Sequence, residues 1–153
     1  MSELSEIYDA IILEMTGLFS STHNRIPNPY SLEDNPDLML NKGWGVAVGA
    51  SNPRELDYCH VRMERTFRLI TTRKMYYIDT KQDIFDATLK ELLDDHTIIQ
   101  KEFYKTDEIG VEAKVDQITI GSSSEPRVIF SEKYKYLSMF TEVFITHSDV
   151  VTA

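Results

Sequence analysis

Few residues in this sequence stand at spacings that support catalysis or metal binding. Cys59 is the single cysteine, which excludes an intramolecular disulfide, and its neighbour His60 would point to the opposite face of a strand. The histidines lie in separate segments, and none pairs with another at the i, i+4 spacing of helical zinc ligands: His23, His60, His96 and His147. We therefore expect no catalytic residue, no cofactor, no metal and no enzyme activity.

One polar cluster, Asp94-Asp95-His96, resembles an acid–base group. It falls where a predicted helix ends, and residues of these types at such a place usually form a solvated cap and turn, which is the interpretation we favour. Gly43-Trp44-Gly45 lacks the third glycine and the following helix of a dinucleotide-binding loop. No nucleotide site is therefore expected.

Charge is distributed unevenly along the chain. A net charge of −9 argues against a protein that binds duplex DNA by neutralising phosphates. Residues 54–81 nevertheless hold seven basic and four acidic residues, a net +3, which leaves −12 for the rest. This basic segment either meets an acidic face of a neighbouring copy, or its arginines pair with glutamates across strands on a solvated sheet face. Contact with nucleic acid is less supported, because no aromatic residues interleave with the arginines as a stacking platform.

The length of 153 residues and the 42% hydrophobic share fit one globular domain. The longest uncharged apolar stretch, residues 10–13, is far shorter than the roughly 20 residues that span a bilayer. Residues 1–6 carry no basic start of a signal peptide. We expect a soluble protein, made in the cytosol, with no membrane contact.

Two segments have the spacing of amphipathic helices. Apolar residues recur at three- and four-residue intervals near the N-terminus, which predicts a helix over about residues 3–18. The same pattern predicts a second helix over about residues 81–94. The next apolar residues either extend this helix or belong to a separate strand or turn: Ile98, Ile99 and Phe103.

Alternating apolar and polar residues predict strands over residues 44–48, 58–72, 111–120, 127–130 and 134–146, with turns at 51–53 and 121–126. Arg65 breaks the alternation of its strand and needs a partner, or the end of the core, if it points inward. The last strand is partly apolar on both faces, so one face covers the core beneath the helices and the second is available to another subunit. These elements predict an α+β fold in one domain, residues 1–153: a mixed, mainly antiparallel sheet with two helices packed on one face.

Residues 20–43 form a long loop, because three prolines and four asparagines disfavour both a helix and a strand ladder. The loop also carries apolar residues that a purely solvated linker would lack. It either docks against a neighbouring molecule or folds back over the sheet of its own chain.

This arrangement resembles the tail terminator (tail completion) proteins of long-tailed bacteriophages. The resemblance is carried by the Pro/Asn-rich loop, the charged strand over residues 62–73, the helix after Thr80, and the final strand from Tyr134-Lys135-Tyr136-Leu137 to Phe144-Ile145-Thr146. It covers nearly the whole chain and rests on element order, length and strand texture, with no invariant motif to match.

The resemblance implies a structural virion protein at the head-proximal end of the tail. Six copies would form a ring on the last ring of the tail tube, stop tube elongation and offer the surface to which the head docks. The implied partners are other copies of the chain, the major tail tube protein and a head-completion or neck protein. DNA would pass through the lumen without specific binding, which an acidic subunit favours by repulsion.

The expected contacts with neighbouring subunits or the tube lie in the loop and on the charged and final strands. They are Tyr30, Leu38, Trp44, Arg62, Arg65, Arg68, Arg73, Tyr136, Phe140 and Phe144. Two other classes stay open: another phage neck or tail protein, such as a head-closure adaptor or a tube subunit, and a small enzyme. The enzyme would need a concave pocket with convergent titratable groups.

Overall fold

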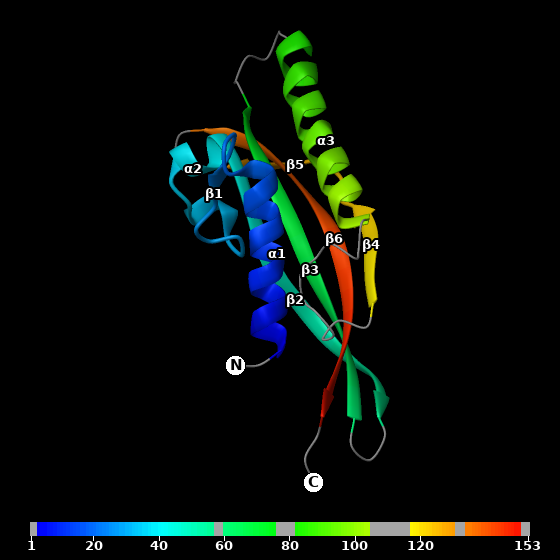
Figure 1. Ribbon diagram of the computed structural model, residues 1–153. Coiled ribbons are helices and arrows are strands. Elements are labelled where there is room, and N and C mark those ends of the chain that lie inside the picture. Colours follow the sequence, from blue (N-terminus) through cyan, green and yellow to red (C-terminus); the bar gives the residue numbers. More distant parts are fainter. Residues whose placement is uncertain (1–2, 57–59, 76–81, 105–116, 131–133, 151–153) are drawn as a thin grey trace.

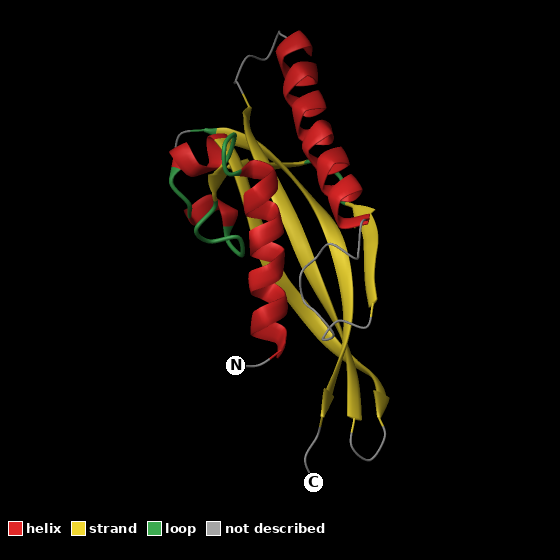
Figure 2. Cartoon of the chain, viewed as in Figure 1, coloured by secondary structure: helices red, strands yellow, loops and turns green. Residues whose placement is uncertain are grey.

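The computed structural model describes residues 3–56, 60–75, 82–104, 117–130 and 134–150. Within these ranges a six-stranded sheet runs through the centre of the chain. Two long helices, α1 (Glu3–Phe19) and α3 (Gln82–Tyr104), cover one of its faces (Figure 1, Figure 2). None of the described helices is long and apolar enough to cross a membrane.

The sheet is mixed and mainly antiparallel. Its order is β1-β2-β3-β6-β4, and β5 also pairs with β6. The first two strands are parallel and the remaining pairs are antiparallel. The strands are β1 (Asn24–Arg25), β2 (Lys42–Leu56), β3 (His60–Met75), β4 (Gln117–Ser123), β5 (Arg127–Phe130) and β6 (Lys135–Val150). The predicted α+β class, with two helices on one face of such a sheet, is confirmed.

The apolar spacing that predicted the helices also explains how they pack. In α1 the fully buried residues follow one another at four-residue intervals: Ile7, Ile11, Met15 and Phe19. The helix predicted over residues 3–18 is confirmed. The second predicted helix continues to Tyr104, past its expected end near residue 94. Of the two alternatives for Ile98, Ile99 and Phe103, the extension of this helix is confirmed, whereas the start of the predicted helix lies outside the described residues.

The turn predicted at residues 51–53 does not form. β2 passes through these residues and absorbs the irregularity in two bulges, one between Val48 and Ser51 and one between Pro53 and Glu55. β1 pairs with β2 at Gly43 and Trp44, so among the described strands only β3 pairs with the stretch around Pro53, which is therefore an edge of the sheet. Proline is tolerated at an edge because its missing N–H is not needed for a second ladder.

The other strand predictions are right in type and inexact in their ends. β3 ends at Met75, β6 continues to Val150, and β5 matches the prediction. Residues 111–116 lie outside the described part of the chain. β4 continues to Ser123, so part of the turn expected at 121–126 is strand.

Alternation along β6 assigns the two faces of the sheet as predicted. One face lies beneath the helices and carries Leu137, Met139, Thr141, Val143 and Ile145; the other carries Tyr136, Ser138, Phe140, Glu142 and Phe144. Arg65 shares the helix face with Phe67, and its Nη1 donates to the carbonyl of Gly49 at 3.0 Å. The inward guanidinium therefore has one backbone partner, whereas its buried Nε has no hydrogen-bond partner among the described residues.

The second face is covered in part by residues 26–41, which we call the strap. The strap contains a short 3-10 helix, η1 (Leu32–Asp34), and one helical turn, α2 (Asp37–Asn41). The prediction that residues 20–43 form neither helix nor strand is therefore wrong in part, since β1 and the start of β2 also lie within this range. Of the two alternatives for this loop, the structure shows that it folds back over the sheet of its own chain. Its contacts form a second buried cluster with Ile26, Leu40, Ala47, Ile70 and Tyr136.

Two asparagines hold the strap in shape. The Asn35 Nδ2 donates to the carbonyls of Asn28, Ser31 and Leu32 at 2.8–3.1 Å, and its Oδ1 accepts the N–H of Asn28 at 2.8 Å. The Asn28 Oδ1 in turn accepts the N–H groups of Tyr30 and Ser31. These side chains satisfy backbone groups that a strand ladder would otherwise satisfy.

Small residues of β2 let the strap approach the sheet closely. A Cβ placed on Gly45 would lie 3.3 Å from the Cβ of Pro29 and 3.4 Å from that of Ile26. The strap therefore rests almost directly on the backbone of β2.

Candidate functional site

A buried ion-pair network joins α3 to the end of β3. The Arg73 Nη1 lies 2.7 Å from the Asp95 Oδ2, and its Nη2 donates to the Asp95 Oδ1 at 2.8 Å, which makes a two-pronged contact between nearly buried side chains. The Arg73 Nε lies 3.5 Å from the Glu91 Oε2 at an ion-pair separation, without the geometry of a hydrogen bond. The Nε2 of His23, a residue just beyond the end of α1, also lies 3.3 Å from the Asp95 Oδ2.

A second polar group lies next to it, around His96. Its Nε2 lies 2.9 Å from the Thr71 Oγ1 and its Nδ1 lies 2.7 Å from the Thr141 Oγ1, so the imidazole bridges β3 and β6 beneath α3. The Ser123 hydroxyl continues the chain of contacts from Thr141 toward β4. Burial lowers the pKa of His96 to about 4, against the smaller opposing effect of the Asp95 carboxylate, so the ring is neutral at pH 7.

These contacts correct the interpretation of Asp94-Asp95-His96 as a solvated cap and turn. The run lies inside α3, and Asp95 and His96 are buried between the helix and the sheet. The Asp95 carboxylate is engaged by a guanidinium and the His96 nitrogens by two hydroxyls, so both act as cross-links between layers. Among the described residues, no group of three or more His, Cys, Asp or Glu is arranged to hold a metal ion.

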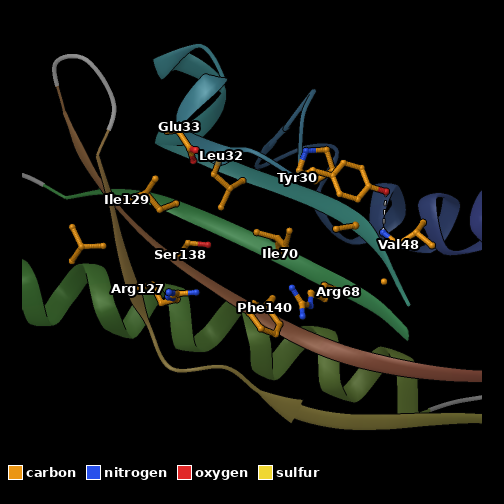
Figure 3. Close-up of a pocket in the computed structure, with 14 residues that line it drawn as sticks. Tyr30, Leu32, Glu33, Val48, Arg68, Ile70, Arg127, Ile129, Ser138 and Phe140 are labelled. Atoms are coloured by element: carbon orange, nitrogen blue, oxygen red, sulfur yellow. Dashed lines mark hydrogen bonds between the residues drawn. The ribbon is translucent and has the colours of Figure 1, made fainter. Parts of the chain in front are cut away.

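The strap face holds a feature of another kind, an open groove of about 380 Å³. Figure 3 shows Tyr30, Leu32 and Glu33 of the strap along one side and Arg127 of β5 with Phe140 of β6 along the other. The floor between these sides is mostly apolar and comes from the sheet: Ala47, Ile70, Ile129 and Ser138. The groove exists because the strap covers only one side of this face.

Two arginines, Arg68 of β3 and Arg127 of β5, carry the positive charge on the side of the groove away from the strap. The Arg68 guanidinium lies 4.9 Å from the centre of the Phe140 ring, and its Nε is 3.9 Å from the Glu142 Oε1. Its side chain is still 53% exposed, and Arg127 is exposed as well. Glu33 lies on the opposite, strap side, so a ligand would meet an apolar floor with positive charge along one wall.

The predicted contact residues fall into two groups. Trp44, Arg73 and Tyr136 are at most 6% exposed and lie in the core, which corrects the expectation that they present a surface. The Tyr136 hydroxyl donates to the Asp37 Oδ1 at 2.8 Å, and burial together with this carboxylate raises the pKa of the phenol. Strand position and residue type did not reveal that these three side chains are used within the subunit.

The remaining predicted residues reach the surface to different degrees. Tyr30 and Leu38 are each 67% exposed, and Arg68, Phe140 and Tyr30 are brought together around the groove. Arg65 and Phe144 are half-buried. Arg62 lies on β3 opposite Ser148 of β6, and its side chain lies outside the described part of the structure.

Sequence reasoning missed the parts of the groove that come from β5 and the strap, chiefly Arg127, Ile129 and Leu32. It also left two uses for the basic segment. Arg68 stands directly opposite Glu142 in the β3–β6 register, which is the cross-strand pairing of the second alternative, while its exposure leaves it available for a partner.

The sequence matches no known protein-family model, and no curated protein is significantly similar to it. The groove and the layout of the sheet are therefore the basis of the functional proposal.

Proposed function

We propose that this chain is a structural subunit that assembles into a ring, closes the end of a phage tail tube and offers a docking surface for the head. It works through shape and self-association and makes or breaks no covalent bond. The order of elements supports this role: a helix, a folded-back loop, a long strand hairpin, a second long helix and closing strands.

One observation carries the proposal. The distal ends of β2, β3 and β6 run well past the ends of both long helices, as Figure 1 shows. Pairing continues into this extension, with Leu56 opposite Val61 and Val61 opposite Asp149. A sheet is normally packed against a second layer, so this extension supports a role in which neighbouring subunits or the tube supply that layer.

The unlike faces of the sheet also support a ring. A closed ring needs two different patches on each subunit, one of which fits the other on the next copy. Here one side of the subunit presents helices and the other presents the groove.

The test is to add the purified chain to tail tubes that are growing from purified tube protein. Tube length should become fixed soon after addition, whereas tubes without the chain keep growing. Continued elongation at saturating protein would reject the proposal. Imaging of labelled chain on the tubes separates a terminator, bound once at one end, from a tube subunit, which would be incorporated along the length.

A further inference from the structure

We infer that the groove on the strap face receives helix α1 of a second copy of this chain, with Leu13 on the apolar floor and Asp9 beside the arginines. This inference rests on the ring of the proposed function and names the two surfaces that would hold it together.

The outward face of α1 is unlike an ordinary solvated helix face. Leu13 is 72% exposed in the middle of the helix, and the exposed positions run along one line at four-residue intervals: Ser5, Asp9, Leu13 and Gly17. A Cβ on Gly17 would meet nothing within 4 Å, so a partner can approach the backbone closely at that end. The helix therefore presents an apolar side chain between a carboxylate and an open spot.

Charge distinguishes α1 from the other long helix as the occupant. The sequence of α1 contains four acidic residues and no lysine or arginine. α3 also exposes apolar side chains, Leu93 and Ile98, but mixes exposed Lys90 and Lys101 with its acids. The groove wall carries exposed Arg68 and Arg127, so α1 is the complementary helix.

The positions of the two surfaces fit repeated association. The α1 stripe lies on the helix side of the sheet, and the groove lies on the opposite side. A contact between them is head-to-tail, because each copy uses its helix toward one neighbour and its groove toward the other. Such a contact closes into a ring when the rotation between copies allows it.

The experiment uses two charge variants that should fail alone and work together. The groove variant is R68E/R127E and the helix variant is D9K. In either variant by itself every contact brings like charges together. In an equimolar mixture, alternating copies pair the introduced lysine with the two introduced glutamates at one contact and the native aspartate with the native arginines at the next. A third variant, L13S, removes the apolar contact without changing charge.

Association is measured by sedimentation equilibrium at low salt, where such charge contacts are least screened. We expect each charge variant to associate at least about tenfold more weakly than the unaltered chain, L13S at least about fivefold more weakly, and the mixture to recover most of the loss. The control variants K90E/K101E and D94K make charge reversals of the same number and sign at exposed positions of α3, and they should leave association unchanged. Circular dichroism and the melting temperature check that every variant is folded.

Three results would overturn the inference: no association of the unaltered chain up to about 1 mM, a mixture that associates no better than its components, or an L13S variant that associates normally. The same proteins are then added to growing tubes. If the charge variants stop growth as well as the unaltered chain, the tube-closing role survives and the contact between α1 and the groove is wrong. If association behaves as expected but the unaltered chain does not stop growth, the proposed function is the part that fails.

Discussion

The two faces of the sheet are covered by different means. On the helix face, α1 and α3 bury a continuous apolar cluster, and the Arg73–Asp95 and His96 contacts lock α3 to the strands. On the strap face, an irregular segment held by Asn28 and Asn35 covers part of the sheet and leaves a groove. We expect the closed face to supply most of the stability, whereas the incomplete cover of the other face leaves the groove open.

The largest effect should come from breaking the closed face at Asp95. Asp95→Ala leaves the Arg73 guanidinium buried without its main partner, and removal of one member of a buried ion pair typically costs about 3–5 kcal/mol. Urea unfolding measures the change, with Asp94→Ala as the control at the exposed neighbouring position. A loss no larger than that of the control would mean that the network does not anchor α3.

The pH dependence of folding should report the same face through His96. The pKa of its ring is about 4 in the folded chain and near 6.5 in the unfolded chain. At pH values between these two, the ring is protonated in the unfolded state and neutral in the folded state. Stability from this group should be complete above about pH 7 and fall by about 3 kcal/mol as the pH drops to 4. Urea unfolding at a series of pH values measures the fall, and His96→Gln should remove this part of it. Equal slopes in the two proteins would contradict the burial of a neutral ring.

A smaller effect should come from separating the strap from the sheet. In Gly43→Ala the new methyl group would press against the Met39 carbonyl and lie 2.6 Å from the Thr72 Oγ1 and 2.9 Å from the Ile26 Cγ1. Overpacking of this kind costs about 1–3 kcal/mol. Hydrogen exchange should show faster opening in the strap than in α1. Gly17→Ala, where the added methyl group meets nothing, should instead stabilise α1 by up to about 1 kcal/mol.

The smallest effect on folding should come from the wall of the groove. Arg68→Glu exchanges a half-exposed cross-strand pair for a repulsion with Glu142, which should cost less than about 1 kcal/mol. Thermal melting measures this, and Arg68→Gln removes the charge without the repulsion. A loss as large as that of Asp95→Ala would show that the open face is as important for stability as the closed one.

Elements that bury one stripe against one layer could be predicted from the sequence. α1 has a single apolar period that decides which side chains turn inward, and the alternation along β6 separates its two faces although both carry buried residues. Their existence, type and faces therefore followed from local spacing alone. The ends of these elements could not be predicted in this way, because the last helical turn and the last strand pairs depend on contacts with other parts of the chain.

Asp95 and His96 show why the second helix was cut short. A carboxylate beside an imidazole indicates a solvated helix end unless a partner neutralises it, and that partner, Arg73, lies 22 residues away on another element. The available signal was spacing, since Asp95 sits midway between buried Leu92 and Ile99 on the same helical stripe. A prediction that treated Asp95 as a buried position with a distant partner would have extended the helix past residue 94.

Only part of the groove could be predicted from the sequence. Arg68, Phe140 and Tyr30 were among the expected contact residues, and alternation along their strands puts the first two on the strap face. The opposite wall depends on hydrogen bonds between Asn28 and Asn35, which the sequence presents only as residues that disfavour regular structure. Local propensity describes what such a segment avoids and does not describe where it packs.

The hydroxyl of Tyr30 accepts the N–H of Val48 at 3.0 Å, at a point on β2 where a neighbouring strand would otherwise bond. Beyond it, two bulges and Pro53 interrupt the run of main-chain groups. Unprotected strand edges recruit identical strands and grow into amyloid-like fibrils. Tyr30, the bulges and Pro53 therefore make this edge of β2 a poor template for the backbone of another copy.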